Sequence, residues 1–180
     1  MLTITIPEQE LFNELTNEFV STKARTIQLE HSLVSISKWE SKWEKPYMSR
    51  EEKTREEAID YIRCMTITQN VNPYIYNALG DENIQKIDKY INARMTATTI
   101  NRKQGGGRSN EIVTSEVIYS WMISLGIPPE YEKWHLNRLL TLIEVCSIRE
   151  QPPKKMSTRD IMSRNAALNA ARRRRLNSKG

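Results

Sequence analysis

The sequence is poor in the residues that most often carry chemistry or form covalent links. It holds two cysteines and two histidines in 180 residues. Cys64 and Cys146 have no CxxC spacing, and each lies within an apolar helical pattern. They indicate buried, reduced thiols of a cytosolic protein. His31 and His135 each stand among apolar or aromatic neighbours, so we expect structural histidines and no metal site.

Long apolar runs and an export signal are also missing. No apolar stretch approaches the roughly 20 residues that a bilayer-spanning helix needs. The N-terminus has no positive region followed by an apolar run, and acidic residues begin at Glu8. No Ser–His–acid or Cys–His set follows from the spacing. We therefore expect no membrane span, no cofactor and no catalytic site.

Glycine is sparse apart from one run, Gly105–Gly107, within a polar stretch at 94–110. The run lacks the GxxxxGK[ST] spacing, and no apolar strand precedes it. A phosphate-binding loop is therefore disfavoured. We interpret the stretch as a flexible loop that orders on a partner.

Charge is the most uneven property of the chain. The basic arm, residues 151–180, carries nine Lys and Arg against one acid, a net charge of +8. The other 150 residues carry 18 basic and 21 acidic residues, a net charge of −3. A mildly acidic body with a basic extension indicates an acidic protein surface or a nucleic acid as partner.

Alternating apolar residues predict a small β element at the N-terminus. Leu2, Ile4 and Ile6 alternate with threonines and end at Pro7. The polar stretch 8–23 has no clear pattern. A second alternation starts at Ile27 and slips by one residue before Ile36, so it is either a bulged strand or the second half of a hairpin.

From Ser37 onward the patterns are helical. Two capping boxes, Ser37 with Glu40 and Ser49 with Glu52, predict the first two helix starts. Proline, glycine and capping residues divide the rest of the chain. We expect helices at about 37–45, 49–65, 72–79, 81–91, 114–125, 129–148 and 157–176. The helix at 129–148 is apolar on more than one face, which predicts burial on most sides.

These patterns predict a mainly α fold. It comprises a multi-helix globular domain with a small N-terminal β hairpin, over 1–150, and an extended basic C-terminal helix in 151–180. The helix in the basic arm has few large apolar residues, so it has little to bury.

Two groups of residues are candidates for partner binding. Trp39 and Trp43 lie four apart on one helical face and alternate with lysines, so they could form a partner-facing ridge. Trp121 and Trp134 are predicted to be core residues instead. The second group is the arginines of the basic arm, for which the structural alternative is a solvated tail: Arg164, Arg172, Arg173, Arg174 and Arg175.

Four segments of the sequence together resemble one protein family. They are His31–Pro46, Asp60–Val71, Lys133–Ile143 and Arg164–Arg172. They resemble the tail assembly chaperones of tailed bacteriophages, and the likeness covers most of residues 31–180. It lies in whole segments and not in a chemical motif.

The resemblance implies a binding protein without catalysis in the host cell cytoplasm. Its partners would be the tape measure protein, which it keeps soluble, and the tail tube protein, which it helps to recruit. It is compatible with a homo-oligomer. The alternatives are a nucleic-acid-binding regulator or packaging factor that uses the basic arm, and a structural component of the virion.

Overall fold

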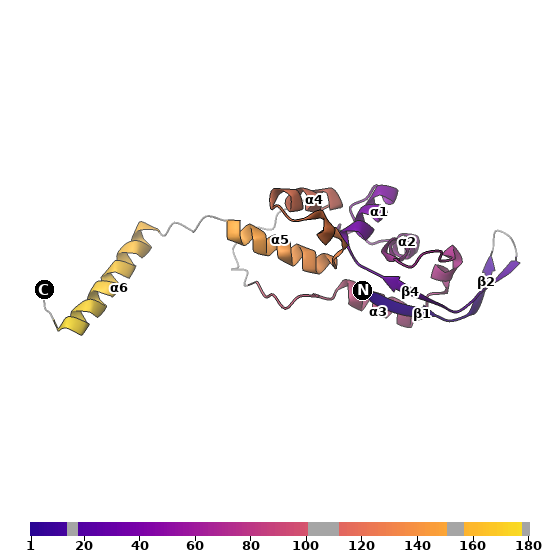
Figure 1. The fold of residues 1–180 in the computed structure, drawn as a ribbon, viewed down its shortest axis with the longest axis horizontal. Helices are drawn as coiled ribbons and strands as arrows, with labels where there is room; N and C mark the ends of the chain where they lie inside the picture. Colours follow the sequence, from indigo (N-terminus) through magenta and orange to yellow (C-terminus); the bar gives the residue numbers. More distant parts are fainter. Residues whose placement is uncertain (14–17, 101–111, 151–156, 178–180) are drawn as a thin grey trace. The chain divides into compact units, whose positions relative to one another are not determined.

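The computed structural model describes residues 1–13, 18–100, 112–150 and 157–177. The predicted mainly helical fold, with a small N-terminal antiparallel element and a long C-terminal helix, is confirmed (Figure 1). The predicted glycine loop, Gly105–Gly107, lies outside the described residues. In chain order the elements are β1 (Leu2–Ile6), β2 (Gln9–Asn13), β3 (Glu18–Thr22), β4 (Arg25–Leu29), α1 (Leu33–Trp43), α2 (Arg55–Met65), the 3₁₀ helix η1 (Pro73–Ala78), α3 (Asp81–Ile91), α4 (Ser115–Ser124), the 3₁₀ helix η2 (Pro129–Lys133), α5 (Leu136–Glu150) and α6 (Thr158–Leu176).

The predicted hairpin is the antiparallel pair of β1 and β4. Ile4 faces Ile27 across the pair, and both side chains are buried. On the exposed face, the hydroxyls of Thr5 and Thr26 form a hydrogen bond of 3.0 Å. Alternation therefore sets the register, because a slip of one residue would expose every isoleucine. Each buried aliphatic side chain contributes roughly 1.5–3 kcal/mol.

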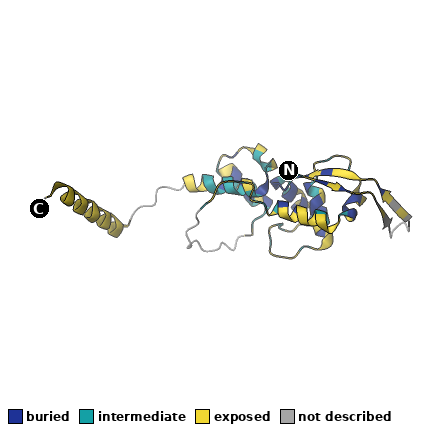
Figure 2. Cartoon of the chain, turned by 90° about the horizontal axis from the view of Figure 1, so that it is seen from below, coloured by how far each residue is buried: buried dark blue, intermediate teal, exposed yellow. Residues whose placement is uncertain are grey.

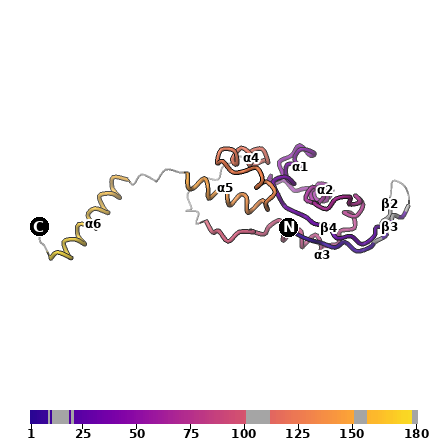
Figure 3. Tube along the Cα trace, in the orientation of Figure 1, coloured from indigo at the N-terminus to yellow at the C-terminus, as the bar shows by residue number. Residues whose placement is uncertain are grey.

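Within the polar stretch 8–23, where the sequence shows no clear pattern, β2 and β3 form a second antiparallel pair. Figure 3 follows the two strands of the hairpin onward into this pair. The other edge of β4 also has a partner, because Ile67 donates its N–H to the carbonyl of Gln28 and Glu30 donates to that of Met65. The end of α2 is thus fixed to the hairpin.

The predicted start of the first helix is wrong. The second strand ends at Leu29, and α1 begins at Leu33 with Ser32 as its N-cap. Ser32 and Ser35 form the capping box in place of Ser37 and Glu40. The earlier start places Leu33, Ile36 and Trp39 on one buried face of the helix.

The second capping box is also displaced. Thr54 caps α2 and pairs reciprocally with Glu57, so the predicted box of Ser49 and Glu52 lies before the helix. The predicted helix at 72–79 is the 3₁₀ helix η1, capped by Asn72. The helix predicted at 81–91 is confirmed as α3, with Gly80 as its N-cap. It packs against β1.

The predicted helix at 129–148 is two helices. After η2, the backbone of Trp134 is extended, and His135 forms a β-bridge with Ser32 before α5 begins. Leu136 donates its N–H to the carbonyl of His31 at 2.7 Å. The predicted burial on most sides is also wrong, because α5 buries one face, formed by Leu136, Leu139 and Ile143. The helix predicted at 114–125 is α4, and Gly126, just beyond it, has the left-handed conformation, with φ +61°.

Contacts divide the chain into two units, Met1–Cys146 and Ser147–Gly180. The first unit contains the core, drawn dark blue in Figure 2. Its fully buried large side chains come from the hairpin and from α1 to α5: Ile6, Ile27, Leu29, Leu33, Ile36, Trp39, Met65, Ile87, Ile118 and Leu139.

The second unit contains α6, the helix predicted at 157–176, with Ser157 as its N-cap. Every residue of α6 is exposed, as its yellow ribbon in Figure 2 shows. The large apolar side chains of α6, Ile161, Met162, Leu168 and Leu176, are between 44% and 74% exposed. No helix within the described ranges is both long and apolar enough to cross a bilayer.

Candidate functional site

The tryptophan pair on α1 is not a partner-facing ridge. Trp39 is 1% exposed, and its indole N–H donates to the backbone carbonyl of Glu57 at 2.9 Å. Trp43 is half-buried and donates to Asp60 at 2.9 Å. The prediction for Trp39 is wrong, because α1 packs this face against α2. Trp43, with part of its ring exposed, stays a predicted contact residue.

The lysines beside these tryptophans are held by buried carboxylates. Lys42 bonds Asp60 at 2.6 Å, and Lys45 bonds Glu57 at 2.6 Å. Glu57 also accepts the N–H of Thr54, and the hydrogen bond from Lys45 lowers the pKa of its carboxyl group. These charges are engaged within the protein, so they form a structural network that joins α1 to α2.

Glu40 joins parts of the chain that are far apart in sequence. One oxygen of its buried carboxylate accepts the N–H of Tyr47 at 2.8 Å, and the other accepts that of Ser115 at 2.7 Å. The second bond binds the end of α1 to the first residue of α4. The carboxylate thus takes the place of a side-chain cap for α4, which Thr114 does not provide.

The other two tryptophans are less buried than predicted. Trp121 is half-buried at the edge of the core. Trp134 stacks on the ring of Tyr131, with centroids 4.3 Å apart, and the guanidinium of Arg138 lies over its indole, 3.9 Å from the centroid. The predicted burial of the thiols is likewise only partial: Cys64 and Cys146 are free and half-buried.

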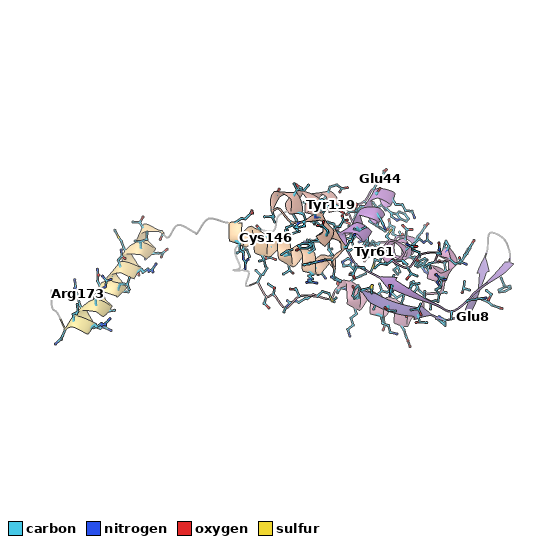
Figure 4. The ribbon with its side chains drawn as sticks, viewed as in Figure 1. Glu8, Glu44, Tyr61, Tyr119, Cys146 and Arg173 are labelled. Atoms are coloured by element: carbon cyan, nitrogen blue, oxygen red, sulfur yellow. The ribbon has the colours of Figure 1, made fainter. Side chains whose placement is uncertain are left out.

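The structure brings the two histidines together, which the sequence did not indicate. The rings of His31 and His135 meet edge to face, with their centroids 5.1 Å apart. His31 Nδ1 bonds the hydroxyl of Tyr61 at 2.5 Å, and Nε2 of His135 bonds the carbonyl of Tyr90 at 3.0 Å. Tyr47 stacks on Tyr61 with centroids 4.0 Å apart. Figure 4 labels Tyr61 among the side chains of this region.

Burial determines what this histidine cluster can do. His31 is 3% exposed and His135 is 5% exposed, so a substrate reaches neither ring unless the core opens. Desolvation lowers the pKa of His31 to about 4, with a smaller effect from His135 in the same direction. Desolvation also lowers the pKa of His135. Both imidazoles are therefore neutral near pH 7 and fix distant segments together, as expected of structural histidines.

The predicted arginines all lie on α6. Arg164 lies in its first half, and the run Arg172–Arg175 is near its end, with Arg173, Arg174 and Arg175 in the last turn (Arg173 is labelled in Figure 4). Positive side chains are favourable there because the helix dipole is negative at this end. Four consecutive residues at 100° steps point around most of the helix. The arginines therefore offer charge on several sides.

The groups that sequence reasoning missed are those whose partners are distant along the chain. His31 and His135 are one case, and Glu40 with Ser115 is another. A single sequence shows which residues are polar within an apolar pattern, but not which ones meet. Comparison with protein-family models, with curated proteins and with solved structures gives no match to this chain.

Proposed function

We propose that the chain is a tail assembly chaperone of a tailed bacteriophage, which holds its client without catalysis in the host cytoplasm. The client is the tape measure protein, and the assembly that follows recruits the tail tube protein. The four segments that resemble the family support this proposal.

One structural observation supports a holding role in particular. A capped helix of 19 residues, α6, has all its residues exposed, including Ile161, Leu168 and the arginines of its last turn. Helices in proteins gain most of their stability from packing, so a helix with no buried face is suited to packing on a partner. Ile161 and Leu168 are seven residues apart and therefore share one side of α6.

The test is capture of the tape measure protein of the same phage by the tagged chain. We expect deletion of residues 151–180 to leave the body folded and to weaken capture. A variant with Arg172–Arg175 replaced by glutamine keeps the helix and separates loss of charge from loss of α6. A truncated chain that captures the client fully would count against the basic arm, and a full-length chain that captures none would refute the proposal.

The exposed arginines also favour a second candidate, binding of nucleic acid through α6. Phosphate contacts would make such binding steeply dependent on salt. Titration with duplex DNA at two salt concentrations distinguishes the two functions. No binding at moderate salt removes the nucleic-acid function and leaves the chaperone function standing.

A further inference from the structure

Between α2 and α3 the body has an apolar hollow, which we name the α2–α3 pocket. Three tyrosines and Ala58 line it together with six larger aliphatic side chains: Ile59, Ile62, Leu79, Ile84, Ile87 and Ile91. Ile84 is 40% exposed, so the hollow is open at the surface. Open apolar surface lined from two helices is the form of a groove that receives another helix.

The size of the pocket indicates what kind of group it receives. Its volume is about 240 Å³. Sites for drug-sized ligands and cofactors usually have about 300–1,000 Å³. The pocket is therefore small for such molecules and suits one or two aliphatic side chains that a larger partner inserts.

The charges at the pocket indicate the sign of the partner. Lys53 and Arg55 line it, with Asp88 as the one carboxylate among the described lining residues. Neither cation forms an ion pair in the part of the chain that the structure describes. The carboxylate of Glu57, which is also close to Lys53, is already bonded to Lys45. The pocket therefore offers two cations to an incoming carboxylate.

The surroundings of Lys53 add to this. Its ammonium lies over the ring of Tyr47, 4.5 Å from the centroid, and 5.8 Å from that of Trp39. Lys53 is partly buried, and this burial lowers the pKa of its ammonium group. A partly desolvated charge gains more from a carboxylate than one in open water does.

We propose that the α2–α3 pocket anchors an aliphatic side chain from an acidic amphipathic helix of the client. The inference rests on the proposed function for the identity of that partner. The helix α6 of a second copy is a poor occupant, because it carries six arginines and one acid, Asp160, and would meet Lys53 and Arg55 with like charge.

The first experiment uses a model helix as the probe. A labelled 20-residue peptide carries leucines along one helical face and glutamates beside them, and a matched peptide carries lysines in place of the glutamates. Fluorescence anisotropy with the full chain is expected to show tighter binding of the acidic peptide. Weak binding of both peptides, or equal binding of both, would overturn the proposal.

Substitutions then locate the binding. Ile84→Gln is expected to weaken binding of the acidic peptide about tenfold, which corresponds to the loss of roughly 1.4 kcal/mol of apolar contact. Ile123→Gln is the matched control, because Ile123 is 80% exposed on α4 and does not line the pocket. Circular dichroism and urea midpoints must match the parent chain. Equal affinity of the Ile84 and Ile123 variants would place the binding elsewhere.

Charge reversal tests the role of the two cations that line the pocket. A chain with Lys53→Glu and Arg55→Glu is expected to prefer the basic peptide. Arg55 is the first residue of α2, where an acid is favoured by the helix dipole, so its replacement does not endanger the helix. An unchanged preference for the acidic peptide would refute the role of these two cations.

A final measurement separates this inference from the proposed function. Capture of the tape measure protein is compared between the parent chain and Ile84→Gln. Equal capture overturns the pocket as a client site while the chaperone function stands. Absence of capture by the parent refutes the function, and the peptides still decide the pocket. If sedimentation shows that Ile84→Gln dissociates a dimer, the occupant is a second copy and the proposal is wrong.

Discussion

Lowering the pH from 7 to 5 is expected to destabilise the body through His31. Burial holds the pKa of this imidazole at about 4, against 6.5 in the unfolded chain. Below pH 6.5 the unfolded chain therefore binds a proton that the folded chain does not. Stability from this group is fully present above pH 6.5 and is lost as the pH falls toward 4. His135, whose pKa is also lowered by burial, acts in the same direction.

The magnitude follows from the size of the shift. At 1.36 kcal/mol per pKa unit, the step from 6.5 to about 4 is worth about 3 kcal/mol once both states are protonated. At pH 5 the unfolded imidazole is almost fully protonated and the folded one only about one-tenth, so the loss is about 2 kcal/mol. That is a large part of a typical stability of about 5–15 kcal/mol.

The assay is urea unfolding at pH 7 and pH 5, followed by tryptophan fluorescence. All four tryptophans lie within Met1–Cys146, so the signal reports the first unit. The control is His31→Asn, in which the side-chain amide, which can both donate and accept, can replace the hydrogen bond between Nδ1 and the Tyr61 hydroxyl. This variant keeps the acid effects of the carboxylates and of His135 but lacks the titration of His31.

We expect the free energy of unfolding to fall by about 2 kcal/mol more in the parent than in His31→Asn over this pH range. We expect the variant to be less stable than the parent at pH 7, and the difference in stability between them to be smaller at pH 5. Equal losses of unfolding free energy in both chains would refute the reasoning. They would mean that the pKa of His31 is not lowered by burial in the folded chain.

Three further substitutions test the packing by urea unfolding at pH 7. Trp39→Phe leaves the carbonyl of Glu57 without its indole donor and opens space in the core, so we expect a loss of about 2–3 kcal/mol. Glu40→Gln presents a donor to one of two N–H groups and is expected to cost about 1–3 kcal/mol; faster hydrogen exchange at Ser115 would locate the effect, and unchanged exchange would contradict it. Glu44→Gly, at a left-handed position with φ 53°, is expected to stabilise α1 by about 0.5–1 kcal/mol, and a destabilised variant would show that the Glu44 side chain contributes more than the strain costs.

Local patterns predicted the kinds of element well, because each kind has its own periodicity. Alternation identified β1, and the residues that cap or terminate helices located α3 and α6 closely. The capping boxes failed in α1 and α2 for one reason. Several Ser and Thr residues satisfy the same spacing rule, and the choice among them depends on which apolar face must be buried.

The break between η2 and α5 could not be predicted locally at all. Residues 129–148 form one continuous helical pattern, yet the backbone at Trp134 is extended because His135 pairs with Ser32. The predicted tryptophan ridge failed in the same way, since burial of Trp39 depends on where α2 packs. The exposure of α6 was predictable, because it follows from the composition of the helix itself.

The bridge between Ser32 and His135 has a consequence for synthesis of the protein. It ties the start of α1 to a segment made about a hundred residues later, through the bond from Leu136 to the carbonyl of His31. A nascent chain that ends before α5 exposes the backbone and the histidine that this bond and its neighbours cover. The first unit therefore completes its fold only after most of the chain has left the ribosome. A stalled chain exposes these polar groups to the chaperones and proteases of the cell.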